Sequence, residues 1–128
     1  MSQPVQAGMS ALDFQKIKDF LTANLTEFNH EAEVCATLQA LSWRINRTKG
    51  SIRRYNLQLY SHFDLIDLSS ESSNSILNKV LQPSSLVSLR VKEFFLMLLN
   101  SLANEYLGRC YLLQRKDIVN LLIQILFT

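Results

Sequence analysis

The sequence is poor in the residues that interrupt helices. Its 128 residues include only 3 glycines and 2 prolines, whereas 48% are hydrophobic. A strand-rich fold needs many tight turns and a disordered chain lacks the apolar side chains for a core, so this composition argues against both. No stretch alternates apolar and polar residues with period two. We therefore expect one all-α domain, because the length suits a single core.

Residues with metal-binding or redox chemistry are scarce as well. The chain has 2 cysteines and 2 histidines. Neither His30 nor His62 sits with Cys, Asp or Glu at a metal-ligand spacing such as His-Glu-x-x-His. Cys35 and Cys110 fall among apolar positions of a helical pattern, so we expect both to be reduced core residues. No motif supports Cys110 as a nucleophile, and we expect no metal and no cofactor.

Glycine-rich loops and paired catalytic carboxylates are missing too. Gly8, Gly50 and Gly108 are isolated from one another, so no phosphate-binding loop precedes a helix. Asp64 and Asp67 flank two apolar residues, a spacing that fits a turn or a helix cap better than a general acid and base. We predict a protein that is not an enzyme.

The chain has neither a long apolar run nor a large net charge. The longest wholly apolar run, 94–99, is far below the roughly 20 residues that span a bilayer. Residues 1–10 have neither the basic start nor the apolar stretch of a secretory signal. A formal charge of +2 is too small to bind nucleic acid or an anionic membrane by itself. We expect an intracellular protein without a membrane span, whose partners are recognised by local patches.

What the sequence does have is helical periodicity. Apolar residues recur at three- and four-residue steps, which places them along one side of successive helices. Ser10, Asn29 and Asp117 are plausible N-caps, Gly50 breaks the pattern, and Pro83 disfavours a helix before it. About seven helical segments follow: 10–25, 29–47, 51–63, 74–81, 84–108, 109–114 and 117–127.

Two of these segments carry clear apolar stripes, and a third carries a weaker one. In the third segment, Ile52, Tyr55 and Leu59 share the expected buried side, and Trp43 in the second segment is also expected to be buried. The stripe of the second segment comprises Val34, Leu38, Leu41 and Ile45, and that of the longest segment comprises Val87, Val91, Phe94, Leu98 and Leu102.

The spacing near the C-terminus favours stacked helical repeats. Segment 104–122 has the Asn, Gly and Leu spacing, short break and apolar helix that are typical of armadillo repeats, with a sharp turn expected at Gly108. The last segment is apolar nearly all round, whereas a soluble solenoid ends on a polar face. We predict an armadillo- or HEAT-like helical solenoid fragment, with a flexible N-terminus over 1–9 and a helical domain over 10–128 that is truncated at its C-terminal end. A closed helical bundle that buries the last helix is the alternative. The predicted C-terminal stacking surface consists of Leu122, Ile123, Ile125, Leu126 and Phe127.

Several runs of residues resemble a known family. They lie at 33–44, 64–68 and 99–112, and the most specific is Leu-Gln-Ala-Leu-x-Trp-Arg at 38–44. Over about residues 30 to 126 the chain resembles the LisH-domain-containing armadillo repeat proteins of cilia. The resemblance implies a ciliary basal-body and centriolar protein that supports ciliogenesis, ciliary microtubule modification and Hedgehog signalling. The chain lacks that family's LisH motif, coiled coil and most of its armadillo array, which implies a short isoform or a fragment.

A local basic cluster is the main candidate binding site. It consists of Arg44, Arg47, Lys49, Arg53 and Arg54, which fall within eleven residues that contain no acidic side chain. These cations could converge on a corner between two helices and bind an acidic peptide, a tubulin tail or a phosphate backbone. Alternatively, they are solvated charges that complement helix dipoles. Because Trp43 and Tyr55 are expected to be buried, nucleic acid is the minor alternative.

The residues and the resemblance together indicate a scaffold or adaptor. We expect protein partners of a ciliary or centriolar kind, including microtubule-associated proteins, and a location in the cytoplasm and cytoskeleton. A generic helical binding module, with a basic patch for an acidic protein or nucleic acid, is the alternative. The serine-rich segment 69–75 is interpreted as a linker that could accept phosphate. We expect no small-molecule substrate.

Overall fold

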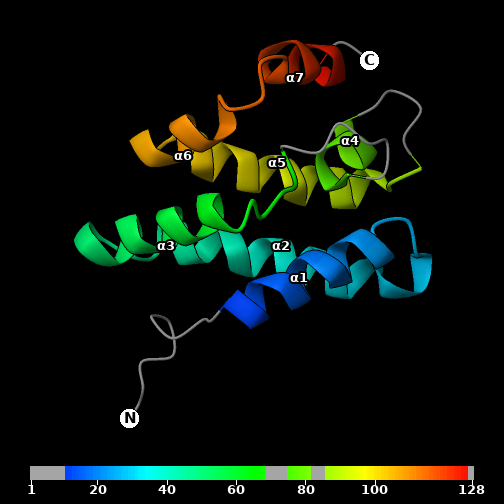
Figure 1. The fold of residues 1–128 in the computed structure, drawn as a ribbon. Helices are drawn as coiled ribbons and strands as arrows, with labels where there is room; N and C mark the ends of the chain where they lie inside the picture. The colour runs from blue at the N-terminus through cyan, green and yellow to red at the C-terminus, as the bar shows by residue number, and fades with distance from the viewer. Residues whose placement is uncertain (1–10, 69–74, 82–85, 127–128) are drawn as a thin grey trace.

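The computed structural model describes residues 11–68, 75–81 and 86–126, which form an all-α fold (Figure 1). Within these ranges there are seven α-helices and no β-strand, as the composition predicted. The helices are α1 (Ala11–Asn24), α2 (Glu31–Asn46), α3 (Gly50–His62), α4 (Ile76–Leu81), α5 (Leu89–Ala103), α6 (Tyr106–Leu112) and α7 (Ile118–Leu126), and a short 3-10 helix, η1 (Phe28–His30), leads into α2.

Four of the helices form two pairs, α2 with α3 and α5 with α6 (Figure 1). One pair lies on the other, and the corresponding helices run in the same direction. The most extensive contact between helices is that of α2 with α5. The starts of these two helices line one small pocket, so they run the same way. Arg53 near the start of α3 forms an ion pair with Glu105 just before α6, so α3 and α6 also run the same way. The pair α2–α3 is therefore stacked on the pair α5–α6.

A single apolar core runs through these layers. The stripe predicted for α2 is buried, and in α5 the predicted stripe is buried except for the partly buried Phe94. Phe14 of α1 anchors its helix to α3, because its ring lies 5.6 Å from that of Tyr60 and 5.4 Å from that of Phe63. Aromatic contacts of this kind add to the burial of apolar area. The helical periodicity thus located most of the core.

Gly108 does not form the sharp turn that its spacing predicted. The long helix α5 ends at Ala103, and Gly108 lies buried inside α6. A Cβ atom there would lie 2.6 Å from the carbonyl carbon of Leu102 and 2.8 Å from its Cα atom. The glycine is needed because two backbones approach closely at this point, not because the chain needs a positive φ.

The segment between α3 and α4 is a tight turn fastened by Tyr111. Asp64 and Asp67 adopt φ angles of 48° and 61°, which few residues other than glycine adopt. The Asp64 carboxylate accepts hydrogen bonds from Leu68 N at 2.8 Å and from the Tyr111 hydroxyl at 2.6 Å. The same hydroxyl accepts a hydrogen bond from Ile66 N at 3.0 Å. One buried phenol therefore ties α6 to this turn.

Some local predictions were wrong. Cys35 is buried as expected, but Cys110 is exposed, because α6 packs on its neighbours through Gly108 and Tyr111. Ser88 provides the N-cap of α5 by accepting a hydrogen bond from Val91 N at 3.2 Å. The predicted cap Ser10 lies outside the described residues, as do 1–9 and most of the serine-rich segment 69–75.

Candidate functional site

The α2–α3 corner brings the five predicted cations together but divides them into two groups. Arg44 is half-buried, and its Nη2 atom donates a hydrogen bond to Oδ1 of the fully buried Asn56 at 3.0 Å. The Asn56 side-chain amide in turn donates to the Arg44 carbonyl oxygen at 3.0 Å. This reciprocal pair holds α3 against α2, so Arg44 has a structural role.

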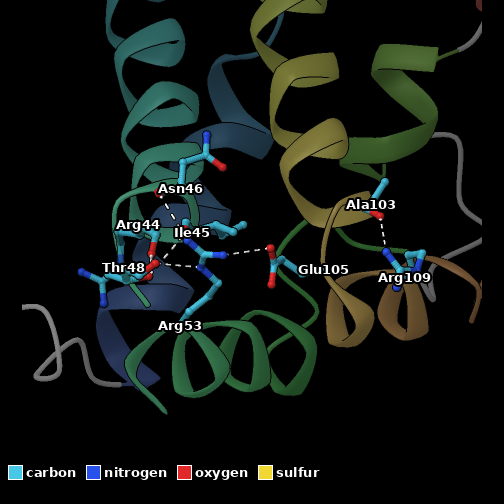
Figure 2. Close-up of polar contacts among 8 residues, drawn as sticks. All are labelled: Arg44, Ile45, Asn46, Thr48, Arg53, Ala103, Glu105 and Arg109. Carbon is cyan, nitrogen blue, oxygen red and sulfur yellow. Dashed lines mark hydrogen bonds and ion pairs between the residues drawn. The ribbon is translucent and has the colours of Figure 1, made fainter. Parts of the chain in front are cut away.

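Arg53 is engaged even more fully (Figure 2). Its Nε atom donates to the carbonyl oxygen of Thr48 at 2.8 Å and its Nη2 atom to that of Asn46 at 3.4 Å. These carbonyls lie at the end of α2 and just beyond it, where backbone acceptors lack helical partners. Its Nη1 atom lies 3.0 Å from Oε2 of Glu105. Arg53 therefore caps the first helix of its pair and links it to the second pair.

The other three cations, Arg47, Lys49 and Arg54, face solvent, and we call them the outer cations. No carboxylate of the described residues forms an ion pair with any of them. The guanidinium of Arg47 lies 3.9 Å from the centroid of the Trp43 ring, which restricts its position through a cation–π contact. Positive charge is therefore available to a partner at this corner.

Two aromatic residues that were expected to be buried are exposed beside the outer cations. Trp43 is 39% exposed and Tyr55 is 43% exposed, so that prediction was wrong. Ile52, which the periodicity also placed on the buried side, is 47% exposed. The orientation of α3 results from tertiary packing. Its buried side carries Asn56, Leu57 and Tyr60, because Asn56 accepts a hydrogen bond from Arg44 of α2.

The backbone adds to the positive potential of the corner. Lys49 precedes α3 without a capping hydrogen bond from its side chain, and the first turn of α3 has no acidic residue. The N-terminus of a helix carries the positive end of its dipole. The corner thus combines exposed cations, the Trp43 ring that Arg47 contacts, and an uncapped helix start.

Glu105 is an ion-pair partner of the basic cluster that the sequence did not reveal. It lies 52 residues from Arg53, and it is adjacent only because α6 stacks on α3. No local motif marks such a pair. Of the five cations that were predicted as a possible acidic-partner patch, Arg53 and Arg44 are therefore engaged by Glu105 and Asn56.

The predicted C-terminal stacking surface is only partly within the described side chains. Leu122 is half-buried and packs against the core, whereas Ile123 is 47% exposed. The side chains of Ile125, Leu126 and Phe127 lie outside the described part of the chain. Val119, also on α7, is 54% exposed, so apolar surface does face outward on this helix.

A second hollow lies between α3 and α6. This groove of about 250 Å³ is lined by residues of both helices, including His62, Cys110 and Tyr111. Among the described residues, no group of three or more His, Cys, Asp or Glu is placed to hold a metal ion. Over the same residues, no helix has both the length and the apolar character to cross a membrane.

Comparison with known proteins gives distant matches to ARMC9 proteins of several mammals. No family model matches the chain, and no solved structure gives a significant match. Over 115 residues the chain is 30% identical to LisH domain-containing protein ARMC9 of Mus musculus and 32% identical to that of Bos taurus. The human protein is 29% identical over the same length. The chain is distantly related to one segment of ARMC9. That match covers 89% of the chain but only 13% of the mouse relative and 16% of the bovine relative.

Proposed function

We propose that this chain is a non-enzymatic scaffold module that works at the ciliary basal body and centriole. In this role it supports ciliogenesis, ciliary microtubule modification and Hedgehog signalling through protein partners. The observation that carries the proposal is the ARMC9 similarity, which extends over 89% of the chain. The stacked pairs α2–α3 and α5–α6 support it, because stacked helix pairs provide extended surfaces for proteins.

The cellular test is localisation of the endogenous protein. We expect a tag at the chromosomal locus to give signal at the basal body, together with centriolar markers, in ciliated cells. Loss of the protein should shorten or remove cilia and reduce the Hedgehog response, and re-expression should restore both. Uniform cytosolic signal, with cilia unaffected by the loss, would contradict the proposal.

We further propose that the helix pairs belong to an open solenoid and that α7 offers its outer face to a neighbouring helix. Val119 and Ile123 support this, because each is about half exposed on α7. The test compares Ile123→Lys with Ile118→Lys, a control at a position that is only 3% exposed. We expect the first change to keep helicity and improve solubility, and the second to unfold the domain. Unfolding by both changes would favour a closed bundle.

A third proposal concerns the outer cations. We infer that Arg47, Lys49 and Arg54 bind an acidic protein segment, because they are exposed and have no carboxylate partner among the described residues. A fluorescent glutamate-rich peptide should bind the chain and lose roughly tenfold in affinity with Lys49→Ser and Arg54→Ser combined. Lys16→Ser, an exposed cation on α1, is the matched control. Preference for a nucleic-acid probe would instead favour the alternative that the exposed Trp43 and Tyr55 support.

A further inference from the structure

The end of α2 that lies away from the α2–α3 corner has chemistry complementary to that of the corner. A pocket of about 100 Å³ lies there, between the segment that leads into α2 and the start of α5. Glu27, Phe28 and Glu31 line one side, and Leu86 and Val91 line the other. We call this the acidic pocket. Its volume is on the scale of one aliphatic side chain.

The rim of the acidic pocket exposes large apolar side chains. Phe28 and Leu86, which line the pocket, are each 86% exposed, and Leu89, which lies in the first turn of α5 outside the lining, is 73% exposed. Covering such side chains is worth roughly 1.5 to 3 kcal/mol each, so an exposed group of them indicates a contact surface.

The charge around this pocket is negative on balance. Glu27, Glu31 and Glu33 all lie on the segment that leads into α2 or in its first turn. Glu33 pairs with His30 at 3.1 Å. Arg90 and Lys92 lie in the first turn of α5, but neither lines the pocket, whereas Glu27 and Glu31 do. The charge of the pocket lining itself is therefore negative.

The α2–α3 corner is the counterpart of the acidic pocket in both charge and shape. Ile52 is 47% exposed there and lies in the sequence between Lys49 and Arg54. Ile52 shares the start of α3 with Lys49 and Arg54, and an exposed aliphatic side chain with cations on the same helix start matches an apolar pocket that Glu27 and Glu31 line. The two surfaces lie at the two ends of α2, because one includes Glu31 and the other begins just after Asn46 (Figure 1).

We propose that copies of this chain associate head to tail. Ile52 of one copy enters the acidic pocket of the next, and Lys49 and Arg54 face Glu27 and Glu31 of that copy. Two different surfaces at opposite ends make a contact that leaves one free surface at each end, so the association adds further copies, as an open chain or a ring, rather than closing as a symmetric dimer. This inference rests on the proposed role of the outer cations and names a second copy as their acidic partner.

The test uses two variants that each block one end. Glu27→Lys with Glu31→Lys blocks the acidic pocket, and Lys49→Ser with Arg54→Ser blocks the corner. In sedimentation velocity the unmodified chain should grow in mass with concentration, and less so at high salt. Each variant alone should associate at least roughly tenfold more weakly, while Lys16→Ser should behave as the unmodified chain. Circular dichroism establishes that both variants remain folded.

Mixing the two variants separates this inference from other modes of association. Each retains the surface that the other lacks, so an equimolar mixture should form a 1:1 dimer that does not grow further. A chain that stays monomeric at all concentrations, or a mixture that does not dimerise, overturns the inference. If the glutamate-rich peptide still binds the corner in that case, the acidic-partner proposal stands; if peptide binding also fails, both are wrong.

Discussion

In both helix pairs, α2–α3 and α5–α6, an arginine of the second helix caps the end of the first. The glycine near the turn between the helices has a different role in each pair. Arg53 is the fourth residue of α3 and donates to carbonyls at the end of α2, and Arg109 is the fourth residue of α6 and donates to the Ala103 carbonyl at 2.9 Å (Figure 2). Gly50 opens α3 with a φ of 57° and has no atom within 4 Å of its missing Cβ. Gly108 lies inside α6 against the backbone of Leu102. Gly50 therefore allows the chain to turn through a left-handed backbone conformation, whereas Gly108 allows α6 to pack closely on the end of α5.

The largest expected difference in the free energy of unfolding is between alanine substitutions of the two glycines. Gly108→Ala places a methyl group against the Leu102 backbone, so we expect a loss of about 3 kcal/mol in the free energy of unfolding. Gly50→Ala meets open space and costs only the left-handed conformation, about 1 kcal/mol. Urea denaturation of both variants measures the difference. Equal losses would mean that the two turns are built alike.

The buried tyrosines provide the next contrast. Tyr111→Phe removes the acceptor of Ile66 N and a donor to Asp64, so we expect a loss of about 2 kcal/mol. Tyr60→Phe removes a donor to the Leu41 carbonyl at 2.9 Å, a group within α2, and should cost about 1 kcal/mol. Thermal melts followed by circular dichroism rank the two changes. A larger loss for Tyr60→Phe would contradict the importance that we assign to the 64–68 turn.

The capping arginines should differ less. Arg53→Ala removes two backbone contacts and a partly buried ion pair, and we expect a loss of about 1 kcal/mol. Arg109 is exposed and makes one such contact, so Arg109→Ala should cost a few tenths of a kcal/mol. Chemical denaturation at low and high salt checks both values. Only the loss for Arg53→Ala should decrease with salt, because it alone includes an ion pair.

Alkaline pH should test the same two tyrosines through the ionisation of their phenols. Burial raises the pKa of Tyr60, and burial together with the Asp64 carboxylate raises the pKa of Tyr111. The unfolded chain ionises near pH 10, so the stability from these neutral phenols is complete below that pH and falls as pH rises above it. We expect a loss of roughly 1 kcal/mol per pH unit for each buried tyrosine. Tyr111→Phe should reduce this slope, and an unchanged slope would contradict the assignment.

The helix-forming segments were predictable because their signal is local. The stripes Val34, Leu38, Leu41, Ile45 and Val91, Leu98, Leu102 are buried as their three- and four-residue spacing required. The same spacing failed for α3, where Ile52 and Tyr55 are exposed while Asn56 is buried. A polar residue is buried there because Arg44 satisfies it, and periodicity alone does not indicate such a partner.

The sequence by itself determined that the chain is all-α, where most helices run and that cations gather near residue 50, since these follow from composition and near-neighbour spacing. Only the tertiary structure decided which of those cations remain available. Arg53 is occupied because the stacking of α6 on α3 brings Glu105 to it from 52 residues away. The packing of α6 on the end of α5 placed Gly108 against Leu102. Contacts between distant segments depend on how whole helices pack, and the residues that meet there carry no mark of each other in the local sequence.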